Sequence, residues 1–124
     1  MPGTRRASDR VRETAQRELT RFLAAARQKF TLHRALAFGS FARGDMHELS
    51  DLDLVLIGDF QAPPRLRERA LRELAWEIGV ETPLQVMALT DAEFERARHR
   101  PFLAHVLKEA VEISLPPLPA DPRA

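Results

Sequence analysis

Residues 38–59 read FGSFARGDMHELSDLDLVLIGD, and the apolar residues 35–38 that lead into this stretch indicate a buried strand. Gly39 lets the backbone leave that strand in a conformation that a side chain would obstruct, and it lets a ligand approach closely. Ser40 is a good helix N-cap, so we expect a short helix to begin there and to point free N–H groups at an anion. Gly44 is expected to end that helix.

Asp51 and Asp53 open the apolar run from Leu52 to Ile57. On a strand, residues two apart point to the same face, so the two carboxylates are expected to project side by side. Like charges that close perturb each other's pKa unless a cation lies between them. Mg²⁺ prefers oxygen ligands and often joins protein carboxylates to substrate phosphates. The pattern therefore favours metal-assisted phosphoryl or nucleotidyl transfer.

Each of these residues also has a purely structural interpretation. Gly39 and Gly44 are ordinary turn residues, and Ser40 is an ordinary cap. An isolated Asp such as Asp51 is most often a turn or cap carboxylate. Asp53 is harder to explain in this way, because an Asp just inside so apolar a strand costs free energy unless it is paired or liganded. The agreement of spacing, strand context and residue types favours a site.

The stretch resembles the signature of the nucleotidyltransferase superfamily that includes DNA polymerase β, in which Gly-Ser is followed by ten residues and Asp-x-Asp. Ala42-Arg43-Gly44 and Ser50 are also typical of that family. The short chain is similar to minimal nucleotidyltransferases, which in prokaryotes are typically encoded beside a HEPN-domain protein; several act as antitoxins that adenylylate it. The resemblance implies an α/β (α+β) fold, with a small mixed sheet flanked by helices.

The resemblance also implies an activity and its residues. AMP would move from ATP to a hydroxyl on a protein partner, with Mg²⁺ or Mn²⁺ held by the catalytic residues Asp51 and Asp53. The nucleotide would contact several residues of the glycine-rich part: Gly39, Ser40, Arg43, Gly44 and Ser50. Arg43 lies about one helical turn after Ser40, where a guanidinium can reach phosphate oxygens. The alternative for Arg43 is a surface pairing with Asp45 or Glu48.

The chain departs from the family at the third carboxylate. Polymerase-β-like enzymes carry it on a neighbouring strand, where it helps to hold the metal and deprotonates the attacking hydroxyl. The strand here is residues 84–89, and the aligned position is Gln85, whose amide can coordinate a cation but cannot act as a base. We expect Gln85 to be the catalytic position, because it alternates with core-directed Leu84 and Val86. Glu81, the nearest carboxylate, is the alternative.

Composition describes one ordinary globular domain of 124 residues with 44% hydrophobic and 30% charged residues. A net charge of +1 gives no electrostatic reason to expect direct nucleic-acid binding. The absence of Cys and of any long apolar stretch favours a cytoplasmic protein without a membrane partner. We expect a single domain over residues 1–124, with flexible tails at 1–7 and 116–124.

Periodicity predicts the remaining elements. An amphipathic helix is expected over about residues 9–29 with Ser8 as its N-cap, and another over 65–78. In the second helix the predicted buried stripe leaves Arg67 on the solvated face and includes six residues: Leu66, Ala70, Leu71, Leu74, Ala75 and Ile78. Thr90 fits a capping box before a helix that runs to residue 98. Residues 101–110 read as a short helix with Phe102 and Val106 inward, and 111–115 as a short strand.

Three functions fit these observations. The first is adenylyl transfer to a HEPN-domain partner, and the second is a weakly active or inactive nucleotide-binding antitoxin that neutralises the same partner by contact. The third, transfer to a small molecule, is disfavoured by the small size of the chain. The sequence does not determine the oligomeric state, although a hetero-oligomer with the partner fits the first two functions.

Overall fold

A mixed four-stranded sheet organises residues 7–118, the part of the chain that the computed structural model describes. In chain order, its elements are α1 (Ala7–Lys29), β1 (Thr31–Phe38), α2 (Gly39–Arg43), β2 (Leu52–Asp59), α3 (Pro64–Glu77), β3 (Leu84–Leu89), α4 (Asp91–Ala97), α5 (Pro101–Glu109) and β4 (Val111–Ile113). The strand order is β3-β2-β1-β4. β1 is antiparallel to β2 and β4, whereas β2 and β3 are parallel because α3 carries the chain back across the sheet.

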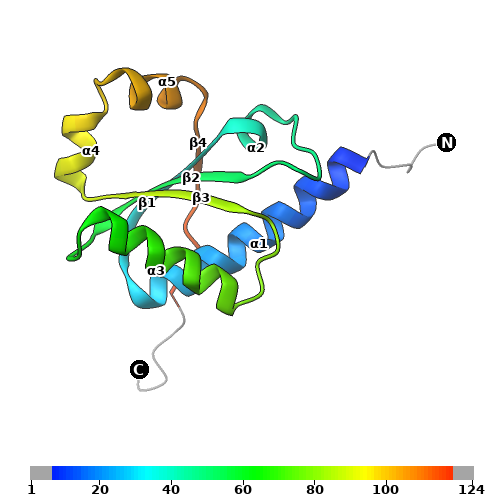
Figure 1. The fold of residues 1–124 in the computed structure, drawn as a ribbon, viewed down its shortest axis with the longest axis horizontal. Coiled ribbons are helices and arrows are strands. Elements are labelled where there is room, and N and C mark those ends of the chain that lie inside the picture. Colours follow the sequence, from blue (N-terminus) through cyan, green and yellow to red (C-terminus); the bar gives the residue numbers. More distant parts are fainter. Residues whose placement is uncertain (1–6, 119–124) are drawn as a thin grey trace.

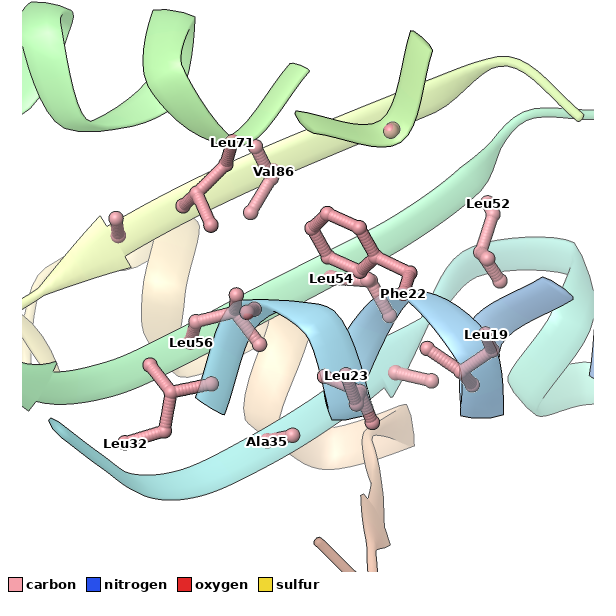
Figure 2. Close-up of a cluster of buried hydrophobic side chains, with 14 of the residues drawn as sticks. Leu19, Phe22, Leu23, Leu32, Ala35, Leu52, Leu54, Leu56, Leu71 and Val86 are labelled. Carbon is pink, nitrogen blue, oxygen red and sulfur yellow. The ribbon is translucent and has the colours of Figure 1, made fainter. Parts of the chain in front are cut away.

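Helices cover both faces of the sheet (Figure 1): α1 and α3 lie on one face, and α4 and α5 on the other. On the first face, Phe22 of α1 and Leu71 of α3 pack with Leu54, Leu56 and Val86 of the sheet (Figure 2). Burying a Leu or Phe side chain is worth roughly 1.5–3 kcal/mol, so this cluster is the main source of stability. A smaller cluster fills the second face: Leu36, Val55, Ile57, Phe94, Leu103 and Val106.

The predicted fold class is confirmed: residues 35–38, 52–57 and 84–89 lie in one mixed sheet flanked by helices. The boundaries differ at several elements. β1 begins at Thr31, and β2 continues to Asp59, because these two strands pair over nearly their whole length. α1 begins at Ala7, so Ser8 lies inside the helix rather than capping it. Of the predicted tails, residues 1–6 and 119–124 lie outside the described part.

The solvated face of α3 was predicted wrongly at its N-terminal half. Leu66 is 54% exposed and Ala70 is also exposed, whereas Arg67 is buried at 6% exposure. The Arg67 guanidinium donates hydrogen bonds to the carbonyls of Ala62 (2.5 Å) and Ala88 (3.1 Å) and to the Glu93 carboxylate (2.6 Å). These partners come from three separate segments, so only the assembled fold can satisfy a buried arginine here.

The last third of the chain follows the prediction more closely. Thr90 and Glu93 form the expected capping box at the start of α4. In α5 the inward residues are Leu103 and Val106; Phe102 is 60% exposed, contrary to the prediction. Trp76 of α3 is 84% exposed. Over residues 7–118, none of the helices is both long and apolar enough to cross a membrane.

Candidate active site

The glycine-rich turn and the paired aspartates meet at one edge of the sheet. Phe38, the last residue of β1, is paired with Asp53 near the start of β2, so the chain turns at Gly39 directly beside Asp53. Asp53 is two residues from Val55, whose side chain lies in the cluster under α4 and α5. By strand alternation, Asp53 belongs to that same face. Asp51 precedes the first residue of β2, so its side-by-side placement with Asp53 stays a prediction.

Two features of the structure require glycine at position 39. Its φ of +70° lies in the left-handed region that side chains disfavour. A Cβ at this position would lie 2.3 Å from Asp53 Oδ2, far inside van der Waals contact. A side chain at position 39 would therefore collide with the Asp53 carboxylate, so only glycine fits at this turn.

The Asp53 carboxylate is half-buried, and the pKa of Asp53 is raised above its ordinary value. Burial is the largest cause, followed by repulsion from the Asp51 carboxylate; the Arg43 guanidinium acts in the opposite direction, and Glu109 adds further repulsion. Two neighbouring oxygen donors whose charges repel are the donor set that a divalent cation stabilises. Asp51 and Asp53 therefore fit the metal that the sequence predicts.

The helix after the turn differs from the prediction in its cap. α2 begins at Gly39 with Phe38 as the N-cap residue, and no side chain caps it, because Gly39 itself makes the turn out of β1. Ser40 lies in the first turn, where its carbonyl accepts the N–H groups of Gly44 (2.9 Å) and Asp45 (3.1 Å). Its hydroxyl is thus not used in capping. Gly44, with φ +84°, ends the helix as predicted.

Arg43 is held between two carboxylates. Its Nε donates to Asp45 Oδ2 at 3.2 Å, and one terminal nitrogen lies 3.3 and 3.4 Å from the two oxygens of Glu109. Glu109 Oε1 also accepts the N–H of Gly39 at 2.9 Å. The sequence interpretation considered Asp45 as a partner but missed Glu109. The position of Glu109 in the sequence did carry one indication of a partner. An acidic residue in the last turn of a helix interacts unfavourably with the helix dipole, so it is expected to have a specific partner that compensates.

Ser50 is buried within the loop that leads into Asp51. Its Oγ accepts the N–H of His47 at 3.0 Å, and its own N–H donates to the His47 carbonyl at 2.9 Å. Ser50 therefore fixes the shape of the loop that presents Asp51. A contact between Ser50 and a nucleotide stays a prediction. His47 itself is an exposed loop residue.

Gln85 and Glu81 occupy different surroundings. Gln85 is the β3 residue paired with Asp53 in the parallel register, and it is exposed at the same edge of the sheet. The N–H of Glu81 instead donates to Glu18 of α1 at 2.5 Å. Glu81 also lines a cavity of about 590 Å³ beside α1, together with Ser50 and Thr82. The register thus brings Gln85, rather than Glu81, next to Asp53.

A second group of metal-ligating side chains lies at the opposite end of the sheet. His33 Nδ1 is 2.7 Å from Asp91 Oδ2, and His33 Nε2 is 3.4 Å from Asp59 Oδ1. The hydrogen bond with Asp91 is the main reason why the pKa of His33 is raised. A carboxylate near each ring nitrogen stabilises the imidazolium of His33 relative to that of a free histidine. Asp59 pairs with Thr31 and Asp53 with Phe38, so the length of β2 separates this group from the turn.

Comparisons with known proteins agree with this geometry. The model of the nucleotidyltransferase domain family matches residues 19–114, and the chain belongs to that family. The fold is similar to a solved structure described as a candidate nucleotidyltransferase from Sulfolobus solfataricus, with 17% identity, 90% of each chain covered and a TM-score of 0.63. It is also similar to a crystal structure of a toxin-antitoxin with AMP-PNP, with 16% identity, 78% of this chain and 70% of that chain covered and a TM-score of 0.53. A search of curated proteins finds no match. The nucleotidyltransferase fold that the sequence implied is therefore confirmed.

Proposed function

We propose that this nucleotidyltransferase moves AMP from ATP to a hydroxyl on a protein partner, as the antitoxin of a pair whose toxin is a HEPN-domain protein. The observation that carries the proposal is the contact of the Gly39 turn with Asp53, which joins a phosphate-binding type of turn to the carboxylate pair. The family match over residues 19–114 supports the reaction class. The similarity to a toxin-antitoxin solved with AMP-PNP supports both an adenine nucleotide and a protein partner.

In this proposal, one pair of residues binds the metal and another pair binds the phosphates. Asp51 and Asp53 would hold Mg²⁺ or Mn²⁺, which when bound polarises phosphate oxygens and neutralises their charge. The Ser40 hydroxyl does not cap α2, so it can donate a hydrogen bond to a phosphate oxygen. Arg43 is exposed and supplies a guanidinium that suits bidentate contact with phosphate.

An exposed apolar residue beside the site favours a protein acceptor. Leu49 is 86% exposed in the loop between α2 and Asp51. Ser50 fixes this loop through its two hydrogen bonds with His47, so Leu49 is presented at a defined position. A docked protein would cover this side chain and bring a hydroxyl to the edge where Asp51 and Asp53 lie.

A second function is favoured by Gln85. The residue paired with Asp53 carries an amide, which cannot accept the proton of an attacking hydroxyl. The protein would then bind nucleotide with slow or no turnover and neutralise its partner by contact.

One experiment separates the two functions. The purified protein is incubated with labelled ATP, Mg²⁺ and the protein encoded beside it, and label on the partner is measured together with complex formation. Transfer of label supports the adenylyltransferase, and its loss in Asp53→Asn ties it to the site. A tight complex without label supports the contact antitoxin. Absence of both transfer and complex formation contradicts both functions.

A further inference from the structure

Glu109 occupies the donors that a phosphate group would use. Its Oε1 accepts the Gly39 N–H at 2.9 Å, and both of its oxygens lie within 3.4 Å of a terminal nitrogen of Arg43. Glu109 is the last residue of α5, 70 positions after Gly39 in sequence, so the contact depends on the assembled fold. Glu109 is half-buried, with 27% of its side chain exposed.

A carboxylate and a phosphate compete for such donors. Both are anions that accept charge-assisted hydrogen bonds from backbone N–H groups and from guanidinium. The Gly39 N–H is a single donor, and it is already satisfied. A phosphate that binds Gly39 and Arg43 must therefore replace the Glu109 carboxylate, and the replaced carboxylate stays nearby because α5 is packed through Leu103 and Val106.

The charges around the turn oppose an anion that arrives alone. The Asp53 carboxylate lies where a side chain on Gly39 would be, Glu109 accepts the Gly39 N–H, and both Glu109 and Asp51 raise the pKa of Asp53. Glu109 is not placed as a further ligand of the same ion: among residues 7–118, the one group of three ligating side chains within mutual reach is that of His33, Asp59 and Asp91. Glu109 thus acts on the donors of the turn rather than on the cation.

We propose that Glu109 is a specificity-determining residue that stands in for phosphate at Gly39 and Arg43 and so selects a metal-complexed triphosphate over metal-free anions. The inference rests on the proposed nucleotide site and adds the criterion by which that site selects its ligand. A metal-free polyphosphate meets the carboxylates of Asp51, Asp53 and Glu109, and a guanidinium that is already paired with Asp45 and Glu109. A triphosphate whose charge is partly neutralised by a divalent cation at Asp51 and Asp53 can displace Glu109.

The test measures binding of inorganic tripolyphosphate and of ATP by calorimetry, each with Mg²⁺ and in EDTA. In Glu109→Gln, which keeps the size and an acceptor oxygen but removes the charge, the affinity for metal-free tripolyphosphate should rise about tenfold or more. Glu109→Ala should show the same gain. Glu112→Gln, which removes a carboxylate paired with Arg34 on the neighbouring strand, is the matched control and should leave the affinity unchanged.

The gain must depend on the freed donor, so adding Arg43→Ala to Glu109→Gln should abolish it. Unchanged or weaker metal-free binding in Glu109→Gln would overturn the proposal, whether or not ATP binds. Failure of wild-type protein to bind Mg²⁺–ATP would instead contradict the proposed function, while the tripolyphosphate comparison still reports on Glu109. A wild-type measurement needs no variant: the Gly39 amide resonance should shift with Mg²⁺–ATP but not with metal-free tripolyphosphate. An amide that shifts with neither ligand, while Mg²⁺–ATP binds, counts against displacement of Glu109.

Discussion

Gly39 lies so close to Asp53 that a Cβ added to Gly39 would be 2.3 Å from Oδ2 of the Asp53 carboxylate. The two residues are adjacent across β1 and β2, since Phe38 pairs with Asp53. Any side chain at position 39 would therefore have to displace the Asp53 carboxylate.

Gly39→Ala should destabilise the protein by more than the roughly 1–2 kcal/mol that a left-handed residue costs, because the methyl must also displace Asp53. Gly44→Ala is the matched control. Gly44 has φ +84°, and nothing lies within 4 Å of a Cβ added there, so this variant should lose only the free energy that the left-handed backbone costs. Urea unfolding of both variants gives the difference. Equal losses would mean that Asp53 moves aside freely.

Asp53→Asn should abolish Mg²⁺-dependent ATP binding while leaving the free energy of unfolding equal or higher. The substitution removes a half-buried charge that Asp51 repels, so the free energy of unfolding should not fall. The same substitution takes a carboxylate ligand away from the cation. Calorimetry and thermal unfolding measure the two effects. Glu48→Gln removes an exposed carboxylate from the preceding loop and should alter neither. Wild-type affinity for Mg²⁺–ATP in Asp53→Asn would refute the site.

Gln85→Glu should increase the rate of AMP transfer, because it puts a base on the β3 residue that pairs with Asp53. General-base catalysis is typically worth ~10²–10⁴-fold, which sets the upper range of the gain. Glu81→Ala should change the rate little, since the Glu81 backbone is bound to Glu18 beside α1. The rates are measured with labelled ATP and the protein partner. The reverse pattern would assign the third carboxylate to Glu81.

Glu93→Gln should destabilise the protein at neutral pH but not in strong acid. The hydrogen bond from the Arg67 guanidinium, followed by that from the Thr90 N–H, lowers the pKa of Glu93 from 4.5 to about 2. A shift of this size corresponds to about 3 kcal/mol. Because the folded-state pKa is the lower one, this stability is complete above pH 4.5 and disappears as the pH falls toward 2. Unfolding free energies of wild type and variant, measured across that range, should converge at the acid end.

Features set by local geometry were predictable from the sequence. The turn at Gly39 and the helix end at Gly44 follow from glycine conformation, and the face on which Asp53 lies follows from strand alternation. The position of Gln85 beside Asp53 needed only the parallel pairing of β2 and β3 in addition.

Features set by distant segments were not predictable. Arg67 was assigned to the solvated face of α3 because its buried partners, Ala88 and Glu93, lie more than 20 residues away. The place of Glu109 in the last turn of α5 indicates that this carboxylate has a partner, but no local pattern identifies that partner as a backbone N–H 70 residues earlier. Contacts across such separations depend on topology, which periodicity does not encode.

The bond between Glu109 and Gly39 also bears on the order in which the molecule is completed during synthesis. The turn, Arg43 and the aspartates are made early, whereas Glu109 is among the last residues of the sheet-forming region to be translated. Domains generally fold as units during translation. The Gly39 turn is therefore expected to reach its final geometry only after the chain has extended through α5, because Glu109 supplies the acceptor for the Gly39 N–H.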